Sequence, residues 1–305
     1  MPATAATINA QLTNYAAGVA QDRASALARF VAPLVPVGLA HGQYKLFSDK
    51  NDFQVHDTSR AIGGTRKRIE FGASDPFFNC APQGLETTID DHERSLAGEG
   101  VALVEEAKIR NLVGAASLSH EKKVFDTLKA GLAATGAIGV WSNASNDPVA
   151  ELDGEIEAIA TATGRMPNRI VFGIGAWRVF RNHAKVLARQ PGAAVVGLGT
   201  DGAARMLLNP GIEIRVGVLG YDTVKFGAAK SASNIAGGEV FIFYASDTPD
   251  QFDPSFMKVF STSGNQIDAV RQYRADNAAS DVFYVDWSED VKVVAAACGR
   301  RITLS

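Results

Sequence analysis

The chain has 305 residues, of which 46% are hydrophobic and 21% are charged, and its formal net charge at pH 7 is −3. This length suffices for one large domain or two medium ones with a real core, and the composition is ordinary for a folded soluble protein. The near-neutral charge excludes a general nucleic-acid-binding surface, so any contact with nucleic acid is expected to be local or indirect. No apolar run approaches the roughly 18 residues of a membrane span, and the N-terminus lacks the charge and apolar core of a signal peptide.

The two cysteines, Cys80 and Cys298, stand far apart and form no CxxC pair or Cys/His cluster. This spacing supports neither a structural zinc site nor a disulfide framework. We therefore expect both to be small buried apolar residues, in a protein that is made and kept in a reducing cytoplasm.

The segment from residue 29 to residue 71 carries the strongest structural pattern. Residues 30–37 are apolar but contain Pro33 and Pro36, which forbid a continuing helix and disfavour a central strand. Short strand-like pieces then alternate with polar and glycine-rich breaks, which predicts an extended arm followed by a long two-legged hairpin. Both would leave apolar edges exposed, and a second copy of the protein is the economical cover for them.

A long helical pattern begins at residue 90, where Asp90 and Glu93 have capping-box spacing. Apolar residues recur at helical spacing as far as Leu132, with a pause at 116–119 where a kink is expected. Roughly forty residues at 1.5 Å each would give a rod of about 60 Å, which suits a flat, elongated molecule.

A mixed α/β unit is predicted to begin near residue 146. Asp147 as N-cap and Pro148 as first helical residue open a helix that Gly164 closes. A second helical pattern follows, and from residue 256 onward the pattern is all β. Strands are predicted at 169–172, 212–216, 239–244, 257–260, 269–274, 282–286 and 291–297. Turns between the last four are predicted at 263–265, 278–280 and 288–290.

A glycine-rich loop is the first candidate for chemistry. The segment Gly197–Gly202 matches GxGxxG, a pattern that lets a backbone approach the pyrophosphate of a dinucleotide. The apolar run before it is short, and the element after it is stopped within two turns by a proline and a glycine. Glu213 also lies nearer than a ribose-binding acid usually does. We therefore interpret the segment as a surface loop.

The remaining candidates also favour structural roles. Asp90 and Asp91, at a helix start, are explained by capping and the helix dipole rather than by paired-carboxylate catalysis. The basic run Arg66–Arg68 favours ion pairs between subunits, or solvent, over phosphate binding. The histidines show no metal-ligand spacing, and the tryptophans are interpreted as core or interface anchors. These residues are His41, His56, His92, His120, His183, Trp141, Trp177 and Trp287. No catalytic, cofactor-binding or metal-binding residue is predicted, so no enzyme is expected.

Five blocks of sequence, taken in order, resemble the major capsid proteins of tailed bacteriophages with the HK97-like fold. They are RFVAPLVPV, GQYKLFSDKNDF, DTSRA with RIEF, GLETTIDDHE and TGRMPNRIVFGIGAW. The resemblance covers nearly the whole chain and implies an α+β fold. Its implied parts are an N-terminal arm (1–41), an extended β-hairpin loop (42–89), a peripheral domain with a long spine helix (90–139), an axial mixed α/β domain (140–250), and peripheral-domain β strands that return to the axial domain (251–305).

The resemblance implies a structural protein of the virion that assembles itself in the host cytoplasm. Pentamers and hexamers would form an icosahedral shell around double-stranded DNA, without sequence-specific DNA contacts and without a membrane. Residues 42–72 would reach over a neighbouring subunit. Because only about 28 residues precede the arm, a separate scaffolding protein is implied, together with a portal protein and with or without a decoration protein. Lys45, Lys50 and Lys67 lie in the loop, but no covalent crosslink through them is inferred.

Two alternatives stay open at this point. An encapsulin-type cellular compartment shares the implied fold but would load an enzyme cargo. A nucleotide-dependent oxidoreductase would instead use the glycine loop at 197–202 and bind NAD(H).

Overall fold

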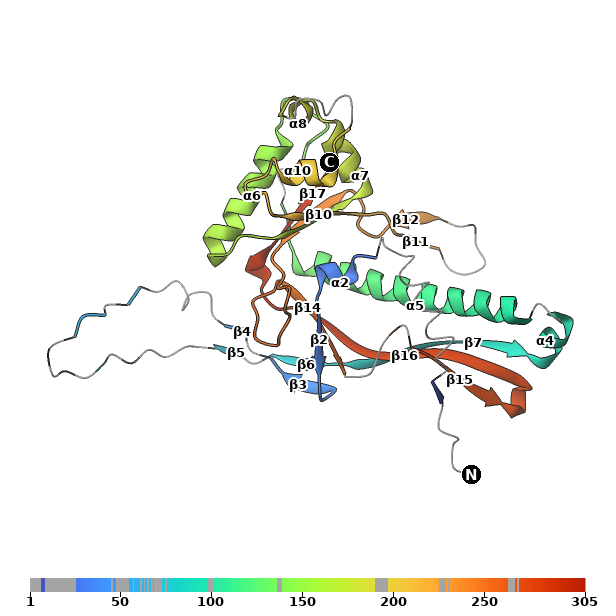
Figure 1. Cartoon of the computed structure of the whole chain (residues 1–305). Helices are drawn as coiled ribbons and strands as arrows, with labels where there is room; N and C mark the ends of the chain where they lie inside the picture. The colour runs from blue at the N-terminus through green and yellow to red at the C-terminus, as the bar shows by residue number, and fades with distance from the viewer. Residues whose placement is uncertain are drawn as a thin grey trace.

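The computed structural model has two parts, and Figure 1 shows a compact upper unit standing on an elongated lower layer. We call the lower layer the platform; it contains a six-stranded sheet and a long helix. The upper unit contains a five-stranded sheet and four helices among the described residues. The structure describes residues 7–8, 26–44, 46–47, 55–56, 58–60, 62, 64, 66, 68, 73–74, 76–97, 101–135, 139–189, 197–224, 229, 231–262, 267 and 269–304.

The apolar arm folds onto its own chain. A short helix α2 (Ala28–Val31) leads into strand β2 (Leu34–Val37), which pairs in parallel with β14 (Met257–Thr262) at the edge of the platform sheet. The predicted avoidance of a central strand is therefore confirmed. The expectation that a second copy covers this segment is wrong, because Phe30, Val31 and Val35 are buried within the chain itself.

The two-legged hairpin is present where its legs are described. Strand β3 (His41–Gln43) pairs antiparallel with β6 (Phe77–Asn79), and β4 (Leu46–Phe47) pairs antiparallel with β5 (Ala73–Ser74). Since Phe47 lies opposite Ala73, the segment between them leaves and re-enters the fold at one place. Most of that segment, including Lys50 and Lys67, lies outside the described residues, as does Lys45 before β4. Its reach over a neighbouring subunit stays a prediction.

The platform is a long helix lying along a sheet (Figure 1). Helix α4 (Asp91–Ala97) is followed by α5 (Val101–Gly131), whose 31 residues span about 47 Å. Its buried face packs on β7 (Ala81–Asp90) and β16 (Ser280–Val293). The sheet order is β1-β15-β16-β14-β2, with β7 also paired to β16; β1 is Thr7–Ile8 and β15 is Val270–Ala275. The predicted kink at 116–119 is wrong, since α5 continues through these residues.

The turn predicted at 288–290 is also wrong, because β16 runs through it as one strand. Ser288 and Glu289 pair with β7 on one side, and Glu289 pairs with Ser261 of β14 on the other. Both polar side chains are buried, and Glu289 is bound by groups of α5. Residues that resemble a solvated turn are thus internal partners. The turn at 278–280 is confirmed, with Ala279 in the left-handed region at φ 43°.

The start of α4 confirms half of the predicted capping box. The Asp90 carboxylate accepts a hydrogen bond from the His92 N–H at 2.7 Å, as an N-cap does. Glu93 does not complete the box; its carboxylate instead lies 2.6 Å from Lys108 Nζ on α5. The acidic start of the helix therefore has a structural role, and Glu93 fastens α4 to the spine.

The upper unit follows the sequence signals closely. Helix α6 (Pro148–Thr163) begins at Asp147, whose side chain accepts from two backbone N–H groups, and ends at Gly164 with φ 66°. Its neighbours are α7 (Ile174–Asn182), α8 (Ala184–Arg189) and α10 (Thr200–Ala204). The sheet order is β10-β9-β13-β17-β8, with bounds β10 (Glu213–Gly217), β9 (Arg169–Gly173), β13 (Glu239–Phe243), β17 (Gly299–Thr303) and β8 (Ala134–Thr135).

The upper sheet is covered on both faces. Ile170 and Phe172 of β9 pack with α6 and α7 in one apolar cluster. On the opposite face, Val171, Phe241 and Phe243 join the cluster that contains α2 and the end of α5. This shared cluster connects the upper unit to the platform. The described chain is therefore an α+β fold whose two units share one apolar cluster.

Candidate assembly surfaces

The described residues show no arrangement suited to catalysis by a metal. No group of three or more His, Cys, Asp or Glu side chains is placed to hold a metal ion in that part of the chain. His41 stacks on Phe77, His120 faces Glu289, and His183 is buried at the end of α7. Both cysteines are free and buried, as predicted. Among the helices that the structure describes, none is long and apolar enough to cross a membrane.

The glycine loop does not open a dinucleotide-type helix. Gly197 adopts φ 83°, and α10 after it has only five residues. A Cβ at Gly197 would lie 2.8 Å from Arg181 Nη2, so the glycine accommodates a side chain of its own fold. The apolar run expected before the loop, at 193–196, lies outside the described residues.

Exposed apolar side chains are spread over distant parts of the molecule. Leu96 and Leu103 are 76% and 70% exposed at the far end of the platform. Phe77 and Phe252 lie near the legs and the β13–β14 connection, and Leu208 lies in the upper unit, each more than half exposed. Large apolar side chains held in water mark contact sites when they gather on a surface. Because these side chains are scattered singly, they do not by themselves mark a contact site.

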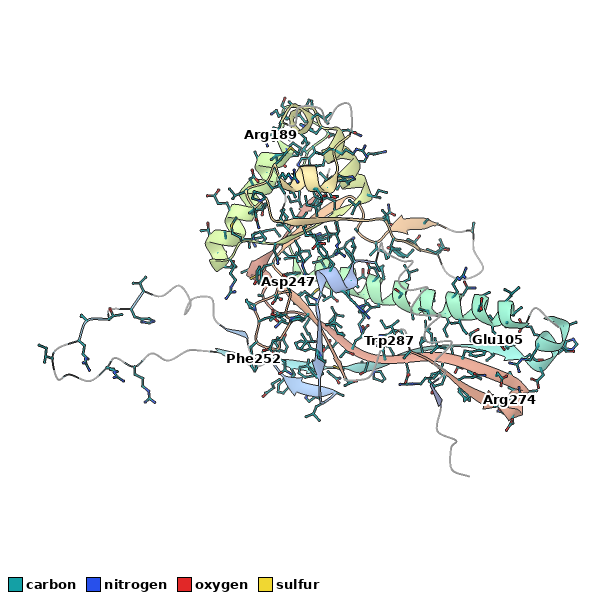
Figure 2. All side chains as sticks on the ribbon, in the orientation of Figure 1. Glu105, Arg189, Asp247, Phe252, Arg274 and Trp287 are labelled. Atoms are coloured by element: carbon teal, nitrogen blue, oxygen red, sulfur yellow. The ribbon has the colours of Figure 1, made fainter. Side chains whose placement is uncertain are left out.

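A network of ion pairs lies at the far end of the platform, and Figure 2 labels two of its residues, Glu105 and Arg274. Arg94 lies 2.5 Å from Asp281 and 3.0 Å from Glu105, which ties α4 to β16 and α5. Arg274 of β15 lies 2.5 Å from Asp91. The hydrogen bond from Arg274 is the main cause that lowers the pKa of Asp91. The network links α4 to α5, β15 and β16 at this end of the platform.

A buried carboxylate fastens the N-terminal arm to the spine helix. Glu121 of α5 is 2% exposed, and its two oxygens accept hydrogen bonds from the Leu27 and Ala28 N–H groups at 2.7 to 3.0 Å. These N–H groups belong to the free start of α2, where a carboxylate is favoured. Burial raises the pKa of Glu121, which the two backbone hydrogen bonds and His120 oppose.

Two further buried charges fasten other parts of the platform. Glu289 of β16 is 3% exposed and lies 2.6 Å from His120 Nδ1 and 3.2 Å from Lys123 Nζ, both on α5. Burial pushes the pKa of Glu289 up, but His120 and Lys123 outweigh it and the pKa is lowered. Lys258 of β14 is fully buried; its ammonium donates to the carbonyls of residues 250, 251 and 253 and lies 3.1 Å from the Asp253 carboxylate.

These three buried charged residues were not predicted from the sequence. A charged side chain within an otherwise apolar strand or helix is the sequence signal that could have indicated such a residue. Lys258, for example, stands between Met257 and Val259 in an apolar strand. Of the residues singled out from sequence, Trp141 and Trp287 are buried as predicted. Arg66 and Arg68 are exposed, and nothing further is described for the run between them.

Comparison with known proteins identifies the fold. No protein-family model matches the chain. A curated relative, the major capsid protein of Burkholderia phage BcepMu, is 27% identical over 188 residues; the alignment spans 58% of this chain and 59% of that relative. A phage-related protein from Bordetella bronchiseptica RB50 superposes with a TM-score of 0.73 at 21% identity, over 98% of this chain and 97% of its own.

Two solved shells extend the likeness. The capsid of the Myoviridae phage XM1 superposes with a TM-score of 0.55 at 10% identity, over 92% of both chains. The holo-SrpI encapsulin of Synechococcus elongatus PCC 7942 superposes with a TM-score of 0.54 at 9% identity, over 92% of this chain and 87% of its own. The chain therefore has the α+β, HK97-like fold of phage capsid proteins, as the sequence blocks predicted.

Proposed function

We propose that this chain is the major capsid protein of a tailed bacteriophage. Its subunits assemble into pentamers and hexamers, and these close into the icosahedral shell that encloses the double-stranded DNA genome. The observation that carries the proposal is the extent of the fold: the likeness to phage capsid subunits covers the upper unit, platform and arm together, over 92% of the chain for phage XM1. The curated relative with 27% identity bears the name of that function.

Each part of the fold has a role under this proposal. The upper unit, of which residues 140–250 form the larger part, meets its copies around the five-fold and six-fold axes, and the platform forms the side of the capsomer. The loop carried by β4 and β5 reaches over a neighbour. Heterologous contacts of this kind close into rings. Interfaces of obligate assemblies of this kind bury more than roughly 2,000 Å².

The proposal includes partners of the assembly. A separate scaffolding protein and a portal protein act during assembly in the host cytoplasm, and the mature protein resides in the virion, with or without a decoration protein. The net charge of −3 supports DNA packaging without tight binding, because strong phosphate contacts would be salt-sensitive and would hinder genome release. The protein acts as a structural element and not as an enzyme.

Negative-stain electron microscopy after size-exclusion chromatography tests the proposal directly. We expect closed shells, or rings of five and six subunits, from the purified chain or from the chain produced with a candidate scaffold. A monomer or dimer that stays so across salt, crowding agent and scaffold would contradict the proposed function.

The loop offers a second test. Phe47 and Ala73 lie opposite each other, so an Asn-Gly turn in place of residues 48–72 would close the legs as a short hairpin. We expect this variant to keep the melting temperature of the unchanged subunit and to lose closed shells. Normal shells from it would contradict the role of the loop.

An encapsulin-type compartment is the second candidate, favoured by the superposition on the holo-SrpI encapsulin. The contents of purified particles would distinguish a phage capsid from an encapsulin-type compartment. A capsid is expected to depend on scaffold and portal genes beside its own, whereas a compartment would co-purify with an enzyme cargo encoded nearby.

A further inference from the structure

A groove lies on one flank of the upper unit, between α7 and the residues that join β12 (Ala232–Asn234) to β13. Its volume is about 770 Å³. Gly175, Gly237 and Gly238 expose backbone there, and the exposed side chains of Ile174, Arg178 and Arg181 stand beside it. Among the described residues that line it, none is acidic. The groove therefore combines an apolar patch with uncompensated positive charge.

The helices of the upper unit carry charges of opposite sign. Helices α7 and α8 contain Arg178, Arg181, Lys185 and Arg189 and no acidic residue. Helix α6 contains Glu151, Asp153, Glu155 and Glu157 and no lysine or arginine. Figure 1 places α6 and α7 on opposite sides of the upper unit. One flank is therefore basic and the other acidic.

Most of these charges already have partners within the chain. On α6, Glu151 accepts from Trp141 at 2.6 Å, Asp153 accepts from the Leu208 N–H at 2.8 Å, and Glu155 lies 3.5 Å from Arg300. On α8, Lys185 and Arg189 bind Ser145 and Asp147.

Three charged side chains remain without such a partner. Glu157 on α6, and Arg178 and Arg181 on α7, are exposed and form no ion pair with any described residue. Glu157 and the two arginines lie on opposite flanks, so a contact between the α6 flank of one copy and the α7 flank of the next would bring opposite charges together.

The outer face of α6 is shaped for close approach. Its exposed positions Ala150, Gly154, Glu157 and Thr161 recur at helical spacing and carry one large side chain, that of Glu157. Gly154 lies in the middle of the helix, and a Cβ there would meet nothing within 4 Å. A glycine weakens a helix interior relative to alanine, and the fold of the isolated chain does not need this one. Contact with another backbone or bulky surface supplies a reason for it.

We propose that the groove beside α7 receives the outer face of α6 from the next copy of this chain, with Glu157 of that copy between Arg178 and Arg181. The contact joins unlike flanks, so it is heterologous and repeats around a ring. This inference rests on the proposed capsid function and names the pair of surfaces that closes the capsomer.

Charge reversal tests the contact. We expect Glu157→Arg, and separately the double variant Arg178→Glu with Arg181→Glu, to raise the subunit concentration needed for rings or shells at least about tenfold, because like charges then face each other. Combining all three substitutions should restore assembly. Electron microscopy and sedimentation of the full chain measure the assembled fraction, and circular dichroism confirms that each subunit is folded.

Asp126→Arg is the matched control. Asp126 is exposed on α5 and pairs only with Lys122 of its own helix among the described residues, and its reversal changes the net charge by the same amount as Glu157→Arg does. It should assemble as the unchanged chain does. Normal assembly by both reversed variants, or failure of the combined variant to recover while its subunits stay folded, would overturn the contact alone. Absence of assembly by the unchanged chain would overturn the proposed function and the contact with it.

Discussion

The upper unit and the platform hold themselves together by different means. The helix-side core of the upper unit is built from apolar side chains of α6, α7, α10 and its sheet. The platform and its arm instead bury three charged residues, Glu121, Lys258 and Glu289. In the upper unit, among the described residues, the buried ionisable side chain is that of His183.

The buried charges of the platform join segments that lie far apart in the sequence. Glu121 binds residues 94 and 93 positions away, and Lys123 binds Glu289 166 positions away. A buried charge without a partner is costly. Each of these three residues therefore favours the one arrangement of chain segments that supplies its partners. The platform uses this to fix register between a helix, an arm and a strand. The upper unit also joins segments that are distant in sequence, such as β8 and β17, but it does so through backbone pairing and apolar packing.

The largest expected loss of stability comes from the apolar core. Phe172→Ala removes a fully buried ring that contacts Trp177 and Phe180, and should lower the free energy of unfolding by about 4 kcal/mol. Chemical denaturation of the subunit measures it. Phe172→Leu is the control and should cost less than half as much. A loss below about 1 kcal/mol for the alanine variant would contradict apolar packing as the main support of this unit.

Glu121→Ala should come next, with a loss of about 3 kcal/mol, because it strands the Leu27 and Ala28 N–H groups in the core. Proteolysis of the N-terminal segment should accelerate as α2 loses its anchor. The matched control is Glu121→Gln, whose amide oxygen still accepts one of these hydrogen bonds. Equal stability of the alanine variant and the unchanged chain would show that the arm is held by its apolar contacts alone.

Acid should act on the platform through Glu289. Its pKa is lowered in the fold, so the stability it contributes is present above its unfolded pKa of about 4.3 and is lost as the pH falls through the folded value. Glu289→Gln should flatten the loss of stability below about pH 4.3. Denaturation midpoints measured across this pH range test it. An unchanged acid slope would mean that other carboxylates carry it.

Glu121 should show the opposite sign. Because burial raises its pKa, the contribution is fully present below the unfolded pKa and declines as the pH rises through the folded value. The Glu121→Gln chain should therefore lack a decline that the unchanged chain shows above about pH 4.3. If the stabilities of the two chains change with pH in parallel in the same denaturation series, the predicted sign of the Glu121 contribution is contradicted.

The smallest effect is a gain. Gly154→Ala fills open space on α6 and should stabilise the isolated subunit by about 1 kcal/mol. The matched control is Gly131→Ala on α5, where a Cβ would lie 2.5 Å from Val293 Cγ2, so this variant should lose stability. Thermal melting of both variants gives the two signs. Destabilisation by Gly154→Ala would mean that this glycine serves the subunit's own fold.

Local signals were enough to predict helix α6 and strands β9 and β13 of the upper unit. Asp147, Pro148 and Gly164 bound α6 as predicted, because capping and left-handed closure depend on residues within one turn. The strands at 169–172 and 239–244 were predicted for a similar reason, since a buried strand is a short apolar run.

The same rules failed where distant partners decide. The residues at 288–290 resemble a turn, but pairing on both sides and the cations of α5 make them the middle of a long strand. The arm was predicted to need a second subunit, but β14 and α5 cover it within the chain. Glu157, Arg178 and Arg181 belong to no sequence motif. Only the structure shows that they lie exposed on α6 and α7.

The sequence by itself determined helix α6, strands such as β9 and β13, the resemblance to phage capsid proteins and the lack of catalytic motifs, because these depend on neighbours in the chain. Only the tertiary structure decided which charges are buried and which remain free at the surface. Burial of a charge depends on partners that approach from far along the chain, and no local pattern contains their position. That is why Glu121 and Glu289 are internal fasteners, whereas Glu157 remains available to another copy.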